Sequence, residues 1–186
     1  LGDPYRNQYS PLDQVNKDNV HKLRVAWEYH TYDSDPEGRT QIQCNPIVVD
    51  GVLYGTSPKL KLFALDAVSG RQLWMFDPAV KTSFSLNVNR GVAYWSDGEE
   101  RRILYTAGPY LFAINAKNGE PVRSFGIEGR ASLKASLGAW AQQYYVSSTT
   151  PGTVYRDLII MGTRVSEGPV SAPGYIRAYS VHTGEV

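Results

Sequence analysis

The stretch Phe63-Ala64-Leu65-Asp66-Ala67-Val68-Ser69-Gly70-Arg71-Gln72-Leu73-Trp74 decides the fold, because it returns twice in altered form within the 186 residues. The second copy is Phe112-Ala113-Ile114-Asn115-Ala116-Lys117-Asn118-Gly119-Glu120, and the third is Arg177-Ala178-Tyr179-Ser180-Val181-His182-Thr183-Gly184-Glu185. Intervals of about 50 and about 65 residues are close to the length of a β-propeller blade, a unit that buries its faces only against neighbouring units. The sequence therefore predicts an all-β protein made of propeller blades.

The repeated positions have predicted structural roles. Alanine suits a place where two blades approach closely, and Asp66 or Asn115 can bond the backbone of the turn. Gly70 supplies a left-handed turn residue, and Trp74 is predicted to pack its large face between neighbouring sheets. The repeat therefore indicates architecture rather than chemistry.

The composition agrees with a β-rich globular protein. The apolar content is 42%, and 13 Tyr, 5 Phe and 4 Trp accompany 17 Gly and 11 Pro, which favours short strands and tight turns. Lys and Arg number 19 against 18 Asp and Glu, so the chain lacks the net charge that would attract nucleic acid. The single cysteine, Cys44, excludes an intrachain disulfide and is predicted to be buried.

The ends of the sequence carry no recognisable targeting signal. No apolar run approaches the roughly 20 residues that cross a bilayer, and the first residues lack the basic-then-apolar plan of a signal peptide. The absence of an initiating Met and the stop at Val186 suggest a processed or truncated product, from which such a segment could have been lost.

The pattern of strands and turns divides the chain into four parts. Residues 1–40 are expected to form an opening segment with a helical turn at 15–21 and a first strand at 23–29. A complete blade is expected at 41–78 and a second blade at 84–125. Residues 126–186 are expected to hold a long insertion and an incomplete third blade. About three blades cannot close a ring. The chain is therefore predicted to be the N-terminal part of a larger propeller, whose open edges are covered by the remaining blades or by self-association.

These residues resemble the start of the quinoprotein dehydrogenases, eight-bladed propellers that bind pyrroloquinoline quinone (PQQ). The similarity begins with Tyr9-Ser10-Pro11-Leu12-Asp13-Gln14-Val15 and continues from Asn45 through Trp74, where the chain resembles the family's first full blade. The phrase Ala-x-Asp-x-x-x-Gly-x-x-x-Trp is similar to the family's tryptophan-docking repeat. Tyr29-His30-Thr31 and Ser124-Phe125-Gly126 are closer to the membrane-bound glucose dehydrogenase branch than to methanol dehydrogenases.

The resemblance implies a cofactor site on three segments. Arg90, in Asn89-Arg90-Gly91, matches an arginine that reaches a PQQ oxygen, and a guanidinium fork suits carboxylate and quinone oxygens. In the second segment, the hydroxyl groups of Ser148 and Thr149 would bond a cofactor carboxylate. In the third, Thr163 and Ser166 would line the cofactor plane, and Glu167 would supply a carboxylate ligand to Ca²⁺.

One departure from the family stands beside Arg90. The alcohol dehydrogenases of the family carry adjacent cysteines before this arginine, whereas this chain has Asn87-Val88-Asn89. A disulfide over the quinone is therefore excluded.

The activity implied is oxidation of an alcohol or a glucose-like aldose with PQQ and Ca²⁺. Electrons would pass to a respiratory quinone or cytochrome in the bacterial periplasm or cell envelope. The general base, an Asp in the family, is expected beyond Val186, so this chain alone is predicted to be inactive. A second hypothesis is a cofactor-free propeller that acts as a scaffold for protein interactions, like an outer-membrane assembly lipoprotein.

Overall fold

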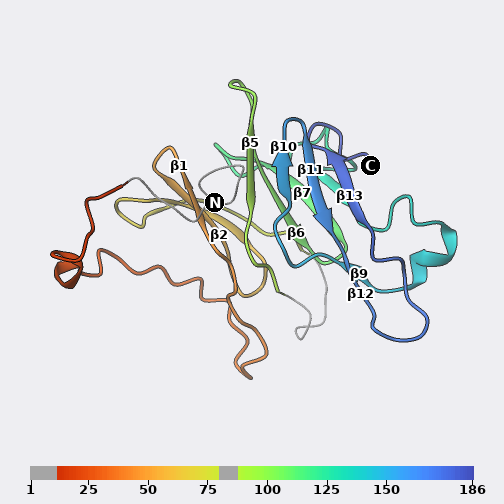
Figure 1. Ribbon diagram of the computed structural model, residues 1–186, viewed down its shortest axis with the longest axis horizontal. Helices are drawn as coiled ribbons and strands as arrows, with labels where there is room; N and C mark the ends of the chain where they lie inside the picture. Colours follow the sequence, from red (N-terminus) through yellow and green to blue (C-terminus); the bar gives the residue numbers. More distant parts are fainter. Residues whose placement is uncertain (1–11, 80–87) are drawn as a thin grey trace.

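The structure, a computed structural model, describes residues 12–79 and 88–186 as antiparallel sheets that follow one another along the chain (Figure 1). Two sheets have four strands paired in chain order, a third has three, and a small sheet has two. The first sheet holds β1 Ile47–Val49, β2 Val52–Thr56, β3 Leu62–Asp66 and β4 Gln72–Phe76. The second holds β5 Ala93–Ser96, β6 Arg101–Ala107, β7 Tyr110–Asn115 and β8 Arg130–Ser132. The third holds β10 Thr153–Tyr155, β11 Leu158–Gly162 and β13 Ile176–Ser180, and in the small sheet β9 Val146–Ser147 pairs β12 Arg164–Val165. The prediction of an all-β fold is confirmed.

The hairpin between β1 and β2 follows from its sequence. Val49 pairs Val52, which leaves Asp50 and Gly51 as the loop residues, with φ angles of 49° and 76°. Positive φ at both loop residues is the conformation that an Asp-Gly dipeptide accepts most readily, and it matches the twist of the two strands.

The apolar core lies between the sheets. One cluster, which includes Leu62, Ile103 and Phe112, fills the space between the first and second sheets. Another, which includes Leu104, Phe125 and Tyr179, fills the space between the second and third. Each sheet therefore buries its face only by stacking on its neighbour, as expected for blades.

Two tryptophans make the same contact with a turn: Trp27 joins the extended segment 23–29 to the first sheet, and Trp74 joins the first sheet to the second. Trp27 donates its indole N–H to the carbonyl of Ala67 at 3.2 Å, and Trp74 donates to the carbonyl of Ala116 at 3.1 Å. Each ring covers a glycine of the turn that it meets, and a Cβ atom added to Gly70 or Gly119 would lie 2.5 or 2.7 Å from the indole. Only glycine fits under the ring at these two positions.

The third turn of this kind, Val181–Gly184, is held in a different way. The ring of Phe125 lies over Gly184, where an added Cβ atom would be 3.0 Å away, but phenylalanine has no N–H to donate. Arg102, only 3% exposed, supplies the hydrogen bonds instead, from Nη1 to the carbonyls of Val181 at 2.8 Å and His182 at 3.1 Å. We call Ala67–Gly70, Ala116–Gly119 and Val181–Gly184 the repeat turns.

Two segments differ from the expected organisation. Residues 23–29 are not a strand: they run extended beside the first sheet, where the ring centroids of Tyr29 and Phe63 are 5.0 Å apart. Their alternating pattern reflects the docking of Trp27 and Tyr29 rather than a strand ladder. The expected turn before them is the short 3-10 helix η1 Val20–Lys22.

The second sheet also extends past residue 125. Its last strand, β8, lies in the stretch expected to be an insertion, which also contains the 3-10 helix η3 Ala139–Gln143 and the strand β9. None of the helices in 12–79 and 88–186 has the length and apolar character that crossing a bilayer requires.

Candidate functional site

Three segments from different sheets meet at one end of β1 and β5. The N–H of Asn45, before β1, donates to the carbonyl of Arg90 at 3.2 Å, and the N–H of Arg90, before β5, donates to the carbonyl of Thr149 at 2.7 Å. At Gly91, where φ is +148°, an added Cβ atom would lie 3.1 Å from the Asn45 carbonyl oxygen, so glycine permits this close approach. We call Asn45, Arg90 and Thr149 the inter-sheet bridge.

The side chain of Arg90 is exposed at this bridge and has a side-chain partner. Its Nε donates to Oε1 of Gln43 at 3.1 Å. A guanidinium carries further N–H donors, so this contact orients the group while leaving donors for a ligand. Gln43 was missed by sequence reasoning, because nothing in its local pattern marks it.

Buried polar side chains run from the first sheet to the third behind the bridge. Asn89 Oδ1 accepts from Thr56 Oγ1 at 3.3 Å, and Asn89 Nδ2 donates to the carbonyl of Thr106 at 3.1 Å. Thr106 Oγ1 donates to the carbonyl of Ser148 at 2.7 Å, and Ser148 Oγ donates to the carbonyl of Gly162 at 2.9 Å. We call Thr56, Asn89, Thr106 and Ser148 the polar ladder; each is less than 5% exposed.

The predicted cofactor hydroxyls differ in what they already bond. Ser148 is 4% exposed and its hydroxyl donates to Gly162, so in this structure it supports the backbone. Thr149 is half-buried, and no hydrogen bond of its side chain is found in the described part of the chain. Thr163, also half-buried, makes a long contact of 3.4 Å to the carbonyl of Tyr175. Thr149 is the hydroxyl best placed to meet a ligand beside Arg90.

Ser166 and Glu167 do not join this group. Arg164 pairs Ser147 and Val165 pairs Val146, so the antiparallel register carries the next residues past Tyr145 and away from Thr149. Both side chains are exposed. No group of three or more His, Cys, Asp or Glu side chains that could hold a metal ion occurs in 12–79 or 88–186.

Two buried carboxylates lie in the loop that precedes the bridge. Asp33 is 7% exposed; its Oδ2 accepts from Ser57 Oγ at 2.6 Å, while Oδ1 has no hydrogen-bond partner among the described residues. Asp35 accepts from Arg39 Nε at 2.9 Å and Nη2 at 3.0 Å, and these bonds lower the pKa of Asp35 to about 2. Burial, with Asp33 nearby, raises the pKa of Tyr29.

Cys44 lies between Gln43 and Asn45 and is half-buried rather than buried. Its Sγ accepts the N–H of Thr56 at 3.3 Å, so the thiol caps an edge of the first sheet beside the bridge.

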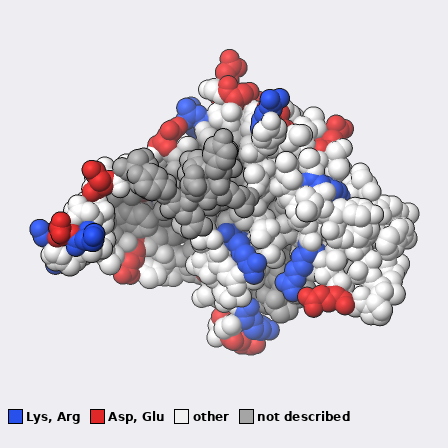
Figure 2. Space-filling view, in the orientation of Figure 1, with Lys and Arg blue, Asp and Glu red and all other residues white. Residues whose placement is uncertain are grey.

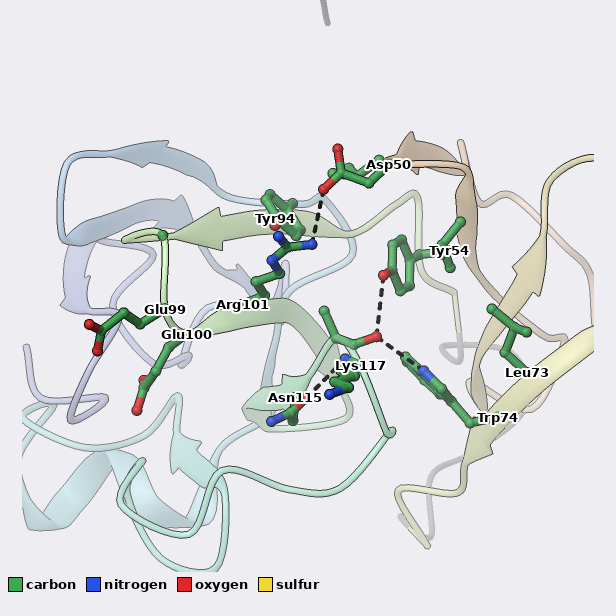
Figure 3. A pocket seen from close by; sticks show the side chains of 14 residues that line it. Asp50, Tyr54, Leu73, Trp74, Tyr94, Glu99, Glu100, Arg101, Asn115 and Lys117 are labelled. Carbon is green, nitrogen blue, oxygen red and sulfur yellow. Dashed lines mark hydrogen bonds and ion pairs between the residues drawn. The ribbon is translucent and has the colours of Figure 1, made fainter.

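A hollow of about 580 Å³ opens between the first two sheets at their opposite end (Figure 3). It is lined by the β1–β2 and β5–β6 turns and by the second repeat turn, with Tyr54 and Trp74 both donating to the Ala116 carbonyl and Arg101 paired with Asp50 at 3.0 Å. The indole of Trp74, the hydroxyl of Tyr54 and the guanidinium of Arg101 are therefore already engaged within the protein.

Charged side chains are scattered over the face that Figure 2 shows, where Lys and Arg alternate with Asp and Glu and no single sign dominates. This agrees with the near-neutral composition. An anionic ligand would therefore be held by local groups such as Arg90 rather than by a broad field.

The comparisons with known proteins identify what the chain is similar to. The family model for the β-propeller domain of PQQ-dependent glucose, ethanol and alcohol dehydrogenases matches residues 1–186. Quinoprotein glucose dehydrogenase of Escherichia coli (strain K12) is 35% identical over 205 residues, which covers 97% of this chain and 26% of the relative. The dehydrogenase subunit of alcohol dehydrogenase (quinone) from Gluconacetobacter polyoxogenes is 35% identical over 191 residues, which covers 100% of this chain and 24% of the relative.

A solved structure agrees with these relatives. The quinohemoprotein alcohol dehydrogenase ADHIIG from Pseudomonas putida HK5 superposes with a TM-score of 0.74 at 30% identity, over 95% of this chain and 24% of that protein. The chain thus spans about a quarter of the length of the proteins that it matches.

Proposed function

Because the chain belongs to the family of PQQ-dependent glucose, ethanol and alcohol dehydrogenase propellers, we propose that it is the N-terminal part of a dehydrogenase that oxidises an alcohol or a glucose-like aldose. The named relatives are quinone-linked glucose and alcohol dehydrogenases. Since the chain spans about a quarter of their length, the activity is proposed for a longer protein, and the chain alone is expected to be inactive.

The proposal is carried by the bridge, where a backbone hydrogen bond joins Arg90, whose guanidinium is exposed, to Thr149, which carries a hydroxyl. PQQ presents carboxylate and quinone oxygens, all of them hydrogen-bond acceptors, and Arg90 and Thr149 are donors that keep free capacity. Their positions are fixed by the 2.7 Å bond between the Arg90 N–H and the Thr149 carbonyl. The donor set therefore fits the cofactor.

Each predicted residue has a distinct proposed role. Arg90 would donate to a cofactor oxygen, with Gln43 holding the guanidinium in place. Thr149 and Thr163 would offer hydroxyl donors, and Ser148 would act through the backbone that it supports. Ser166, exposed beyond β12, is the least favoured of the set. The redox chemistry, a two-electron oxidation of the substrate carbinol, would be supplied by PQQ when it is bound.

The residues of 12–79 and 88–186 do not on their own provide the ligand set that Ca²⁺ requires. Ca²⁺ requires several oxygen ligands, and Glu167 would supply at most one carboxylate. A Glu167 contact to Ca²⁺ remains a prediction whose other ligands would come from elsewhere in the protein. We derive no chemical step from it.

The remaining assignments follow the family. We propose that an Asp outside these 186 residues takes the substrate hydroxyl proton, that a respiratory quinone or a cytochrome accepts the electrons, and that the protein works in the bacterial periplasm or cell envelope. Membership in a dehydrogenase family favours this reading over a cofactor-free scaffold.

Substitution of Arg90 tests the proposal. In the full-length protein, Arg90→Ala removes a charge-assisted hydrogen bond and is expected to weaken PQQ binding by about tenfold or more. Titration followed by quinone absorbance measures this affinity. Arg123→Ala, an exposed arginine outside the bridge, is the matched control and should bind PQQ normally. A wild-type protein that does not bind PQQ would overturn the proposed function.

A further inference from the structure

The separation between Arg90 and the Ser148–Thr149 segment is not set by any sheet. Arg90 leads into the second sheet, whereas Ser148 and Thr149 follow β9 and lead into the third. No strand ladder joins these two sheets in the described ranges. The proposed cofactor donors are therefore placed relative to one another by individual bonds between the sheets.

One of those bonds comes from a single buried side chain. Thr106, on β6 and 2% exposed, donates its hydroxyl to the Ser148 carbonyl at 2.7 Å. The next carbonyl along the chain, that of Thr149, accepts the Arg90 N–H. Displacing the Ser148 carbonyl would therefore shift the acceptor of Arg90 and the Thr149 hydroxyl together.

Thr106 is also fixed from the other side. Its own carbonyl accepts Nδ2 of Asn89, whose Oδ1 accepts the Gly91 N–H at 2.8 Å. The two residues that flank Arg90 in the sequence are thus tied to Thr106, and Thr106 is tied to Ser148. A buried group that loses its partner is costly, so this connection has little freedom to move.

We propose that Thr106 is a positioning residue for the cofactor site: its hydroxyl holds the Ser148–Thr149 segment at the distance from Arg90 that PQQ requires. This inference rests on the proposed function. It assigns no contact between Thr106 and the cofactor, because the side chain is buried behind the bridge.

A graded series at this position tests the role in the full-length protein. Thr106→Ser keeps the hydroxyl, Thr106→Cys offers only a weak donor of similar size, and Thr106→Val removes the donor while preserving shape. PQQ affinity is expected to stay within about threefold of wild type for Ser, to fall for Cys, and to fall by about tenfold or more for Val. Thr183→Val, at an exposed hydroxyl of a repeat turn, is the control and should change nothing.

A second readout does not depend on the cofactor. The Arg90 amide should exchange with deuterium about tenfold faster or more in Thr106→Val than in wild type, because its acceptor is no longer held, whereas the amides inside β6 and β7 should exchange as before. If the Val variant fails to fold, the comparison of Ser with Cys decides.

The outcomes separate the two ideas. Failure of wild type to bind PQQ overturns the proposed function and leaves the amide exchange to test the positioning. The positioning role alone is overturned if wild type binds PQQ and Thr106→Val has the same PQQ affinity and the same Arg90 amide exchange rate as wild type. If Thr106→Val does not fold, the same conclusion follows from equal values in Thr106→Cys and Thr106→Ser.

Discussion

Arg39 shows what an exposed arginine does for a buried carboxylate. Its guanidinium bonds both oxygens of Asp35, whose side chain is 6% exposed, within the loop that leads to the bridge. Arg90 is exposed in the same way but meets only the neutral Gln43 through its side chain in the described structure. The first arginine closes a loop, and the second keeps donors for a ligand.

We expect Arg39→Gln to raise the pKa of Asp35 from about 2 toward its ordinary value of 3.8. The folded pKa is depressed, so this pair contributes stability that is present above the unfolded pKa and is lost as the pH falls through about 4 toward about 2. Carboxyl NMR of Asp35 measures the pKa, and the stability difference between wild type and variant should shrink across that window.

Glu37→Gln is the control for this prediction, because Glu37 meets Arg39 at 3.3 Å on the surface, where ion pairs contribute little. An Asp35 pKa that is the same in Arg39→Gln and wild type would show that the pair does not set it.

The sequence predicted some of the candidate site and missed the rest for a physical reason. Family resemblance indicated Arg90 and Thr149, which the structure brings together. Gln43 and Thr106 could not be found this way, because each acts through a contact far along the chain, 47 and 42 residues away. Family resemblance also indicated Glu167, but the register of β12 directs that residue away from Thr149.

Among the structural elements, β6 makes side-chain hydrogen bonds to two segments outside its own sheet. Arg102 near one end bonds the third repeat turn, and Thr106 near the other bonds the Ser148 carbonyl. One strand of the second sheet therefore holds the neighbouring sheet at both ends.

Arg102→Met is expected to lower the free energy of unfolding by about 1–3 kcal/mol, because the buried Val181 carbonyl loses its donor and the partly buried His182 carbonyl loses a hydrogen bond. Trp74→Phe should cost less for the hydrogen bond alone, since Tyr54 still donates to the Ala116 carbonyl at 3.2 Å. Denaturant unfolding of the full-length protein measures both variants.

Adding Phe125→Trp to Arg102→Met should restore part of the lost stability, because an indole N–H can then meet the Val181 carbonyl. If the double variant is no more stable than Arg102→Met, the hydrogen bond to the Val181 carbonyl is not what stabilises the third repeat turn.

The pattern of alternation and turns predicted most strands but not their partners. The strands around Ala64, Ala113 and Ala178 lie in the three copies of the repeat, which mark them locally. Residues 23–29 alternate like a strand yet pair with none in the described chain, since alternation reports which side chains are buried and not what covers them. The three residues of β8 were missed because the sequence there shows no strand pattern.

At the scale of the whole molecule, the outer face of the third sheet is apolar and exposed. Leu158, Ile160 and Ile176 are 40%, 38% and 78% exposed, and Ile160 pairs Ala178 across β11 and β13. A sheet face of this kind is stable when another layer covers it.

We therefore expect the isolated 186-residue chain to self-associate through this face. Ile160→Lys with Ile176→Lys should shift it toward monomer in sedimentation velocity over a range of concentrations, while Val68→Lys, at an 85% exposed position of a repeat turn, should leave association unchanged. A wild-type chain that sediments as a monomer at every concentration would refute the prediction.

The three repeat turns each present a backbone carbonyl to the preceding part of the chain, and the donor that meets it differs: Trp27 at Ala67, Trp74 with Tyr54 at Ala116, and Arg102 at Val181. A related protein can thus lose the tryptophan at one of these turns and keep the packing of its sheets, provided that another side chain donates a hydrogen bond to the same carbonyl. Counting tryptophans in distant relatives would then miss some repeats, whereas the turn glycine that lies under a ring is present in all three copies here.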